Sequence, residues 1–177
     1  MKLPQNIKKI LINVGVMVGV YLLVGLWQTR NLLSEDDGVA PGFELVDLQG
    51  KSHRLGGDPQ GQGGAVAKPA LVYFFAPWCS VCDLTSSNVE DLKASFGDDL
   101  EVLAVALSYS GPAAVRKFAD NHQLKVPVLL GHDGVGLAYK VAAYPTFYFI
   151  DPEGKIAHKT MGYTSMLGLW LRSYFMI

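Results

Sequence analysis

The sequence predicts an α/β domain, a sandwich with a mixed central sheet, preceded by one N-terminal transmembrane helix. Three observations carry this prediction. An uncharged apolar run lies near the N-terminus, strand patterns alternate with helical patterns from Ala70 onward, and a strand pair with a closing helix ends the chain. Such alternation is typical of helices that pack on a sheet containing parallel strands.

The apolar run covers residues 10–27 and contains no charged side chain. As a helix it would span about 27 Å, close to the thickness of a bilayer's hydrocarbon core. A buried core helix of this length normally carries a polar stripe. A cleaved signal peptide has a shorter apolar stretch that ends in small residues, whereas this run ends in Trp27 and Gln28. The run therefore predicts an uncleaved signal anchor.

The charges that flank the run predict its orientation. Lys2, Lys8 and Lys9 precede it, and the single Arg30 that follows is soon offset by acidic residues. Positive charge favours the cytoplasmic side of a membrane. We therefore expect the rest of the chain outside the cytoplasm, in the periplasm of a Gram-negative cell. The expected organisation is a cytoplasmic segment at 1–9, the anchor at 10–27, a linker at 28–41 and a folded domain at 42–177.

The overall composition narrows the class of protein. A formal net charge of -1 leaves no basic field that could hold nucleic acid, so we expect no nucleic-acid partner. With 2 cysteines in 177 residues the chain is not a disulfide-dense scaffold. Its fold must therefore rest on a hydrophobic core.

The elements of the domain follow from apolar periodicity and turn residues. Residues 42–55 predict a β-hairpin, residues 56–69 a flexible loop, and residues 70–76 a strand buried on both faces. The later predictions are a helix ending near Phe96, a strand at 101–107, a helix at 111–124, a strand at 126–130, a helix at 135–141, strands at 146–150 and 155–161, and a helix at 165–175.

The helix that ends near Phe96 has an apolar arc at 100° per residue. The arc contains Val81, Leu84, Thr85, Asn88, Val89, Leu92 and Phe96, and it leaves out Asp83, Ser86, Ser87, Glu90 and Lys93. We expect this arc to face the core.

Cys79 and Cys82 stand at the start of this helix with two residues between them. Structural zinc needs about four ligands, and the four histidines are scattered singly. Covalent haem attachment needs a histidine directly after the second cysteine, where Asp83 stands. A structural disulfide would close a very short loop and remove little entropy from the unfolded chain. A metal site and a purely structural disulfide therefore explain the two cysteines less well than a redox-active pair does.

The predicted strand-to-helix junction suits redox chemistry. The free N–H groups and the dipole of the helix favour a thiolate at Cys79. Cys82, one turn further along, could attack the sulfur of Cys79. We expect Cys79 to form a mixed disulfide with a substrate and Cys82 to resolve it, with no metal or organic cofactor.

The segment from Phe75 to Cys82, together with the later Tyr144-Pro145-Thr146, resembles a thioredoxin-fold protein. With the anchor, the hairpin and the turn at 151–155, the chain looks like the TlpA/ResA/DsbE group of membrane-tethered thiol–disulfide oxidoreductases.

This resemblance implies a role for each residue of the motifs. Cys79 would be the nucleophile and Cys82 the resolving thiol, with Trp78 beside the exposed sulfur. Pro145 would be cis and face the pair, and Tyr144 would offer its backbone to a substrate strand. Thr146, after Pro145, would be a further supporting residue. The implied partners are periplasmic protein thiols and disulfides, and a membrane protein that donates or accepts electrons.

The sequence also departs from the group's pattern. Tyr73 stands where thioredoxins usually carry a buried Asp, and Thr85 stands where TlpA-like reductants often carry a Glu. The intervening Ser80-Val81 has neither the Pro of many reductants nor the His of strong oxidants. The direction of electron flow therefore stays open from the sequence.

Several functions remain for this motif. The group's commoner role is a reductant, as in cytochrome c maturation, and an oxidant or a metal-stress protein is the alternative. A module that binds Cu(I) or a client through the two thiolates is a further alternative. A peroxidase of the same superfamily fits less well, because Ala76 replaces the Thr that helps to bind peroxide.

Overall fold

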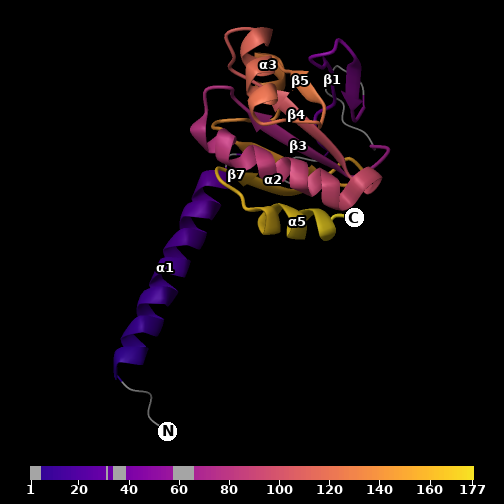
Figure 1. Cartoon of the computed structure of the whole chain (residues 1–177). Coiled ribbons are helices and arrows are strands. Elements are labelled where there is room, and N and C mark those ends of the chain that lie inside the picture. Colours follow the sequence, from indigo (N-terminus) through magenta and orange to yellow (C-terminus); the bar gives the residue numbers. More distant parts are fainter. Residues whose placement is uncertain (1–4, 31, 34–38, 58–65) are drawn as a thin grey trace. The chain divides into compact units, whose positions relative to one another are not determined.

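A computed structural model describes residues 5–30, 32–33, 39–57 and 66–177 of the chain (Figure 1). The chain divides into two units, residues 1–31 and residues 32–177. The predicted linker at 28–41 and the predicted loop at 56–69 fall partly on residues 31, 34–38 and 58–65, which lie outside the described part.

The first unit contains helix α1, Gln5–Thr29. Its stretch Ile7–Gly25 is long and apolar enough to cross a membrane. A single N-terminal helix of this kind confirms the predicted candidate for a membrane span.

The second unit is built on a five-stranded sheet in the order β5-β4-β3-β6-β7. Strand β3 pairs in parallel with β4 and antiparallel with β6, so the sheet is mixed, as predicted. β4 also pairs in parallel with β5, and β6 pairs antiparallel with β7. The strands are β3 Ala70–Phe75, β4 Glu101–Ala106, β5 Val128–Leu130, β6 Thr146–Ile150 and β7 Ile156–Met161.

Every residue of β3 is buried, because side chains cover both faces of the sheet. Leu71, Tyr73 and Phe75 pack in a cluster with residues from three helices, α2 Ser80–Phe96, α3 Pro112–Asn121 and α5 Met166–Tyr174. Helices α2 and α5 lie side by side on this face (Figure 1). A short 3-10 helix, η2 Gly97–Asp99, follows α2.

The opposite face carries a second cluster. Val72 and Phe74 of β3 pack there with the hairpin β1 Phe43–Val46 and β2 Ser52–Leu55 and with α4 Asp133–Ala138. The predicted elements are present and differ from the structure mainly at their ends. The predicted helix at 111–124, for example, ends at Asn121.

Leu32 and Leu33 lie within the predicted linker, yet both side chains are buried in this second cluster. The backbone N–H of Leu33 donates to the Tyr148 hydroxyl at 3.2 Å. The Lys159 ammonium donates to the Leu32 carbonyl at 3.0 Å. Leu32 and Leu33 are therefore held in the second unit by packing as well as by hydrogen bonds.

The predicted core-facing arc of α2 is wrong at three positions. Leu84 is 68% exposed and Val81 is 37% exposed, whereas Ser86 is fully buried. The Ser86 hydroxyl donates to the Cys82 carbonyl at 2.7 Å, which satisfies its polar group inside the core. The buried face of the helix therefore follows Cys82, Ser86 and Val89, and two apolar side chains are left in solvent beside the cysteine motif.

Candidate active site

Cys79 is the N-cap residue of α2, directly after the turn that follows β3. Its sulfur accepts a hydrogen bond from the Cys82 backbone N–H at 3.3 Å. The first N–H groups of a helix have no partner inside the helix, so a sulfur at the N-cap takes the place of a capping oxygen. Cys79 is 7% exposed. Its side chain is therefore less accessible than the exposed sulfur that the sequence led us to expect.

Cys82 lies one turn inside α2 and is fully buried. Both cysteines are free thiols in this structure. Burial raises the pKa of the Cys82 thiol well above its ordinary value, and the Cys79 sulfur raises it further. The Ala76 backbone and the Tyr73 side chain act in the opposite direction and lower this pKa. Cys82 is therefore held as a protonated thiol at neutral pH.

The wall opposite the pair comes from the turn before β6. The Tyr144–Pro145 peptide bond is cis, as the resemblance implies. The Cys79 thiol donates to the Tyr144 carbonyl at 3.5 Å, across 65 positions of sequence. The fold thus brings Cys79, Cys82, Tyr144 and Pro145 together.

Trp78 lies beside this group and is 67% exposed. Its indole meets the Tyr144 ring edge-on, with 5.8 Å between the ring centroids. The indole N–H donates to the Ser108 carbonyl at 2.7 Å. Trp78 is therefore an oriented surface aromatic and does not belong to the core.

Thr146, the last of the predicted supporting residues, has a different environment. It is buried as the first residue of β6, and its hydroxyl donates to the Ala143 carbonyl at 2.7 Å. This bond closes the turn that carries Tyr144 and Pro145. Thr146 thus contributes to the shape of the turn.

Two buried hydroxyls beside Cys82 are absent from the predicted site. The Tyr73 hydroxyl donates to the Cys82 carbonyl at 3.3 Å, and the Ser86 hydroxyl donates to the same oxygen. The sequence singles out Tyr73 only as a departure from the family pattern, and it places Ser86 on the solvent side of α2. No local pattern indicates that both hydroxyls converge on one carbonyl.

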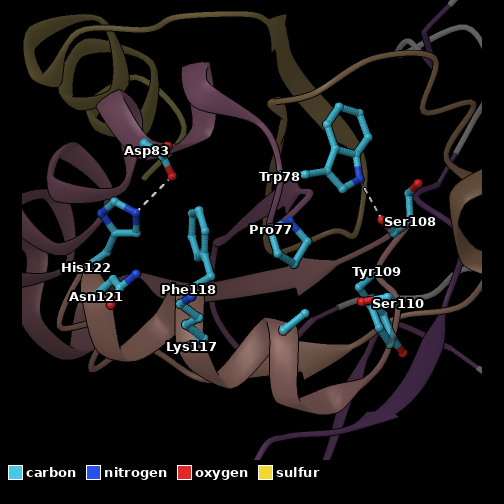
Figure 2. Close-up of a pocket in the computed structure, with 11 residues that line it drawn as sticks. Pro77, Trp78, Asp83, Ser108, Tyr109, Ser110, Lys117, Phe118, Asn121 and His122 are labelled. Carbon is cyan, nitrogen blue, oxygen red and sulfur yellow. Dashed lines mark hydrogen bonds and ion pairs between the residues drawn. The ribbon is translucent and has the colours of Figure 1, made fainter.

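A pocket of about 510 Å³ opens beside the cysteine motif (Figure 2). Pro77 and Trp78 form one wall, and residues 108–110 form the next. α3 supplies the remaining wall, ending at His122. Figure 2 shows the His122 ring directed at the Asp83 carboxylate, and the Nε2–Oδ1 distance is 3.0 Å.

Within the described residues, no three side chains of His, Cys, Asp or Glu come close enough together to hold a metal ion. The geometry offers the chemistry of two sulfurs, one capping the helix and the other buried behind it.

Comparison with known proteins places the chain among relatives with this chemistry. The family described as the AhpC/TSA family matches residues 37–159. The thioredoxin-like protein YneN of Bacillus subtilis is 31% identical over 143 residues, which cover 80% of this chain and 82% of that protein. The thiol-disulfide oxidoreductase ResA of Geobacillus kaustophilus is 27% identical over 156 residues, which cover 84% of this chain and 85% of that one.

A solved structure agrees with these relatives. The pneumococcal exposed lipoprotein thioredoxin Etrx1 of Streptococcus pneumoniae superposes with a TM-score of 0.63 at 26% identity, over 76% of this chain and 98% of that one. This chain has the mixed sheet, the cysteine pair at the head of α2 and the cis proline opposite that pair. The chain therefore belongs to the AhpC/TSA family, as a thiol–disulfide oxidoreductase of the thioredoxin fold.

Proposed function

We propose that this protein is tethered to the membrane by α1 and reduces disulfides in proteins outside the cytoplasm. The observation that carries the proposal is the placement of the two sulfurs. Cys79 caps the N-terminus of α2 next to the Tyr144 carbonyl, and Cys82 is buried one turn behind it. One sulfur can meet a client and the other can reach only its neighbour.

The proposed reaction uses these two sulfurs in order. The Cys79 thiolate attacks one sulfur of a client disulfide, the client S–S bond breaks, and the departing client thiolate takes up a proton. Cys82 then loses its proton and attacks the Cys79 sulfur, which forms the Cys79–Cys82 disulfide and releases the second client thiol. Two electrons pass to the client, and no metal or organic cofactor takes part.

The surroundings of Cys79 support the reductive direction. Strong oxidants of this kind hold their reduced form through a well-stabilised thiolate. Here the Cys79 sulfur faces one backbone N–H and, on its other side, the Tyr144 carbonyl oxygen. A carbonyl oxygen accepts a hydrogen bond from a thiol but repels a thiolate. A thiolate at this position therefore gains less stabilisation than in strong oxidants, which supports a lower reduction potential.

The location of the domain is part of the proposal. Helix α1 is long enough to act as the anchor, and Lys8 and Lys9 at its start favour a cytoplasmic N-terminus. The relative Etrx1 is described as an exposed lipoprotein, which supports an extracytoplasmic place for this domain too. A membrane protein that re-reduces the pair would complete the cycle, and cytochrome c maturation is the family role that suits it.

Insulin-disulfide reduction by the full chain in detergent tests the chemistry. We expect Cys79→Ser to abolish reduction, because no nucleophile remains. We expect Cys82→Ser to accumulate a mixed disulfide with the client, visible by mass spectrometry. Full activity of Cys79→Ser would refute the mechanism.

The reduction potential of the pair tests the direction separately. Equilibration with glutathione or dithiothreitol buffers gives the value. A potential near or below about -250 mV would support a reductant, whereas one near about -120 mV would show an oxidant. A fusion of alkaline phosphatase to the C-terminus tests the location, since the enzyme must be active if the domain lies outside and inactive if it lies in the cytoplasm.

A further inference from the structure

The pocket beside the cysteine motif is lined by Pro77 and Trp78, the two residues that precede Cys79. Trp78 lines the pocket and also meets the Tyr144 ring. The indole meets Tyr144 at one edge and donates its N–H to the Ser108 carbonyl at the pocket wall. Trp78 directly precedes Cys79 in the chain, so one wall of the pocket is adjacent in sequence to the attacking residue.

The walls of the pocket are held in place without a ligand. The Trp78 N–H bond to Ser108 is 2.7 Å long, and the Tyr109 hydroxyl donates to the Gly131 carbonyl at 2.9 Å. Phe118 stacks on Phe75 from the core side, with 4.7 Å between the ring centroids. A preformed pocket loses little entropy when it is filled.

The pocket combines an apolar floor with unused hydrogen-bond donors. Pro77, Trp78 and Phe118 provide the apolar surface. The Lys117 ammonium and the Asn121 amide lie at the rim, and neither has an ion pair or hydrogen bond with any residue in the described ranges. An adjoining hollow of about 440 Å³ shares these two residues.

The single carboxylate that lines the pocket is already paired. Asp83 lies 3.0 Å from His122 Nε2, and Figure 2 shows this pair at the opposite end of the pocket from Ser110. The Lys117 ammonium is therefore the charged donor in the pocket that has no ion-pair or hydrogen-bond partner among the described residues. A partner with complementary chemistry carries a carboxylate on an apolar stem.

We propose that this pocket receives a carboxylate-bearing side chain of the client, within a few residues of the client cysteine that Cys79 attacks. The methylene groups of that side chain would lie on Trp78 and Phe118, and its carboxylate would meet Lys117. This inference rests on the proposed exchange reaction, because the client must be joined to Cys79. It assigns the protein a preference for acidic segments around client disulfides.

Peptide substrates of matched sequence test the preference. Each peptide carries one cysteine as a mixed disulfide with a neutral thiopyridyl group. Across the set, a single Glu occupies in turn each position from three residues before the cysteine to three residues after it. The partner set has Gln at the same positions. In single-turnover reactions, the reduced full chain in detergent should release thiopyridone with a second-order rate constant about three- to fivefold higher for Glu than for Gln at one or two positions.

Two charge-reversal variants locate the effect. Lys117→Glu should invert the Glu-to-Gln ratio, because the rim now repels a carboxylate. Lys155→Glu makes the same change in net charge in the turn between β6 and β7, away from the pocket, and should keep the wild-type ratio. The ratio is taken within each variant, so a general loss of activity cancels. Salt at about 0.5 M should reduce the wild-type ratio toward one.

The outcomes separate this inference from the proposed function. If no peptide reacts and the neutral reagent 2,2'-dithiodipyridine also fails, the exchange reaction itself is refuted. If the peptides react but Glu and Gln are equal at every position, the pocket has no acidic client and the inference is overturned. A Glu preference that survives Lys117→Glu would overturn it too, since the carboxylate would then bind elsewhere.

Discussion

The Tyr73 hydroxyl donates a hydrogen bond to the Cys82 carbonyl at 3.3 Å inside the core. Its ring is stacked between Phe75 and Phe147, with centroids 5.4 and 4.9 Å away. Burial raises the pKa of Tyr73 well above its ordinary value, so this hydroxyl stays protonated at every physiological pH. The strand residue that faces the resolving cysteine is therefore a fixed hydrogen-bond donor that cannot act as a base.

Removal of this hydroxyl should slow the second step of the reaction. In Tyr73→Phe the Cys82 carbonyl keeps its bond from Ser86, so the loss of stability should be about 1 kcal/mol. The Cys82 thiol loses the Tyr73 side-chain contribution that lowers its pKa, so its pKa should rise. For each unit by which the pKa of Cys82 rises, we expect the mixed disulfide to resolve about threefold more slowly, as measured by stopped-flow release of the client thiol.

Tyr148→Phe is the matched control for this variant. Tyr148 is equally buried, and its hydroxyl donates to the Tyr139 carbonyl on the face of the sheet away from the cysteines. Because Tyr148→Phe also removes the acceptor of the Leu33 N–H, it should lose at least as much stability, and it should resolve the mixed disulfide at the wild-type rate. Equal rates for Tyr73→Phe and the wild type would show that the hydroxyl has a structural role alone.

The raised pKa of Cys82 predicts how stability depends on pH. The folded protein holds the Cys82 proton more tightly than the unfolded chain does. The resulting contribution to the free energy of unfolding is fully present below the pKa of the unfolded thiol, about 8.5. It is lost as the pH rises toward the pKa of Cys82 in the folded protein. Between about pH 8.5 and 9.5 the reduced protein should lose roughly 1 kcal/mol of unfolding free energy that a Cys82→Ala variant does not lose.

Denaturant unfolding under reducing conditions measures this difference. The pH window ends near 9.5 because unfolded tyrosines begin to ionise at about pH 10, and buried Tyr73 and Tyr139 would then add the same kind of loss. Parallel pH profiles for the wild type and Cys82→Ala would contradict the prediction.

Trp78 should matter more for client binding than for stability. Trp78→Phe removes the N–H bond to Ser108, but the indole is 67% exposed, so the unfolding free energy should fall by less than about 1 kcal/mol. The KM for a protein client should rise about three- to tenfold, because exposed aromatics of this kind dominate contacts. Trp170→Phe on α5 is the control, and a KM change of the same size in both would argue against a docking role.

The local elements of this fold could be predicted because their patterns are local. The strand at β3 is a continuous apolar run, and the later strand and hairpin at 146–161 are bounded by turn residues. The cysteine pair could be assigned to the head of a helix for the same reason. The buried side of that helix could not, since Ser86 enters the core only by donating to the Cys82 carbonyl.

The site itself depends on contacts between distant segments. Cys79 meets the Tyr144 carbonyl 65 positions away, and Asp83 meets His122 39 positions away. Nothing in the residues around either partner specifies the other. These pairings exist because β3 and β6 lie side by side in the sheet and because α3 packs on the same face as α2.

The sequence by itself determined the apolar N-terminal helix, the α/β class and the two cysteines at the start of α2, since each follows from composition or periodicity within a short segment. The tertiary structure alone decided that Tyr73 and Ser86 share the Cys82 carbonyl and that Trp78 borders a pocket with a free lysine. Hydrogen bonds and pockets of this kind form where separate elements pack, and packing is a property of the whole chain.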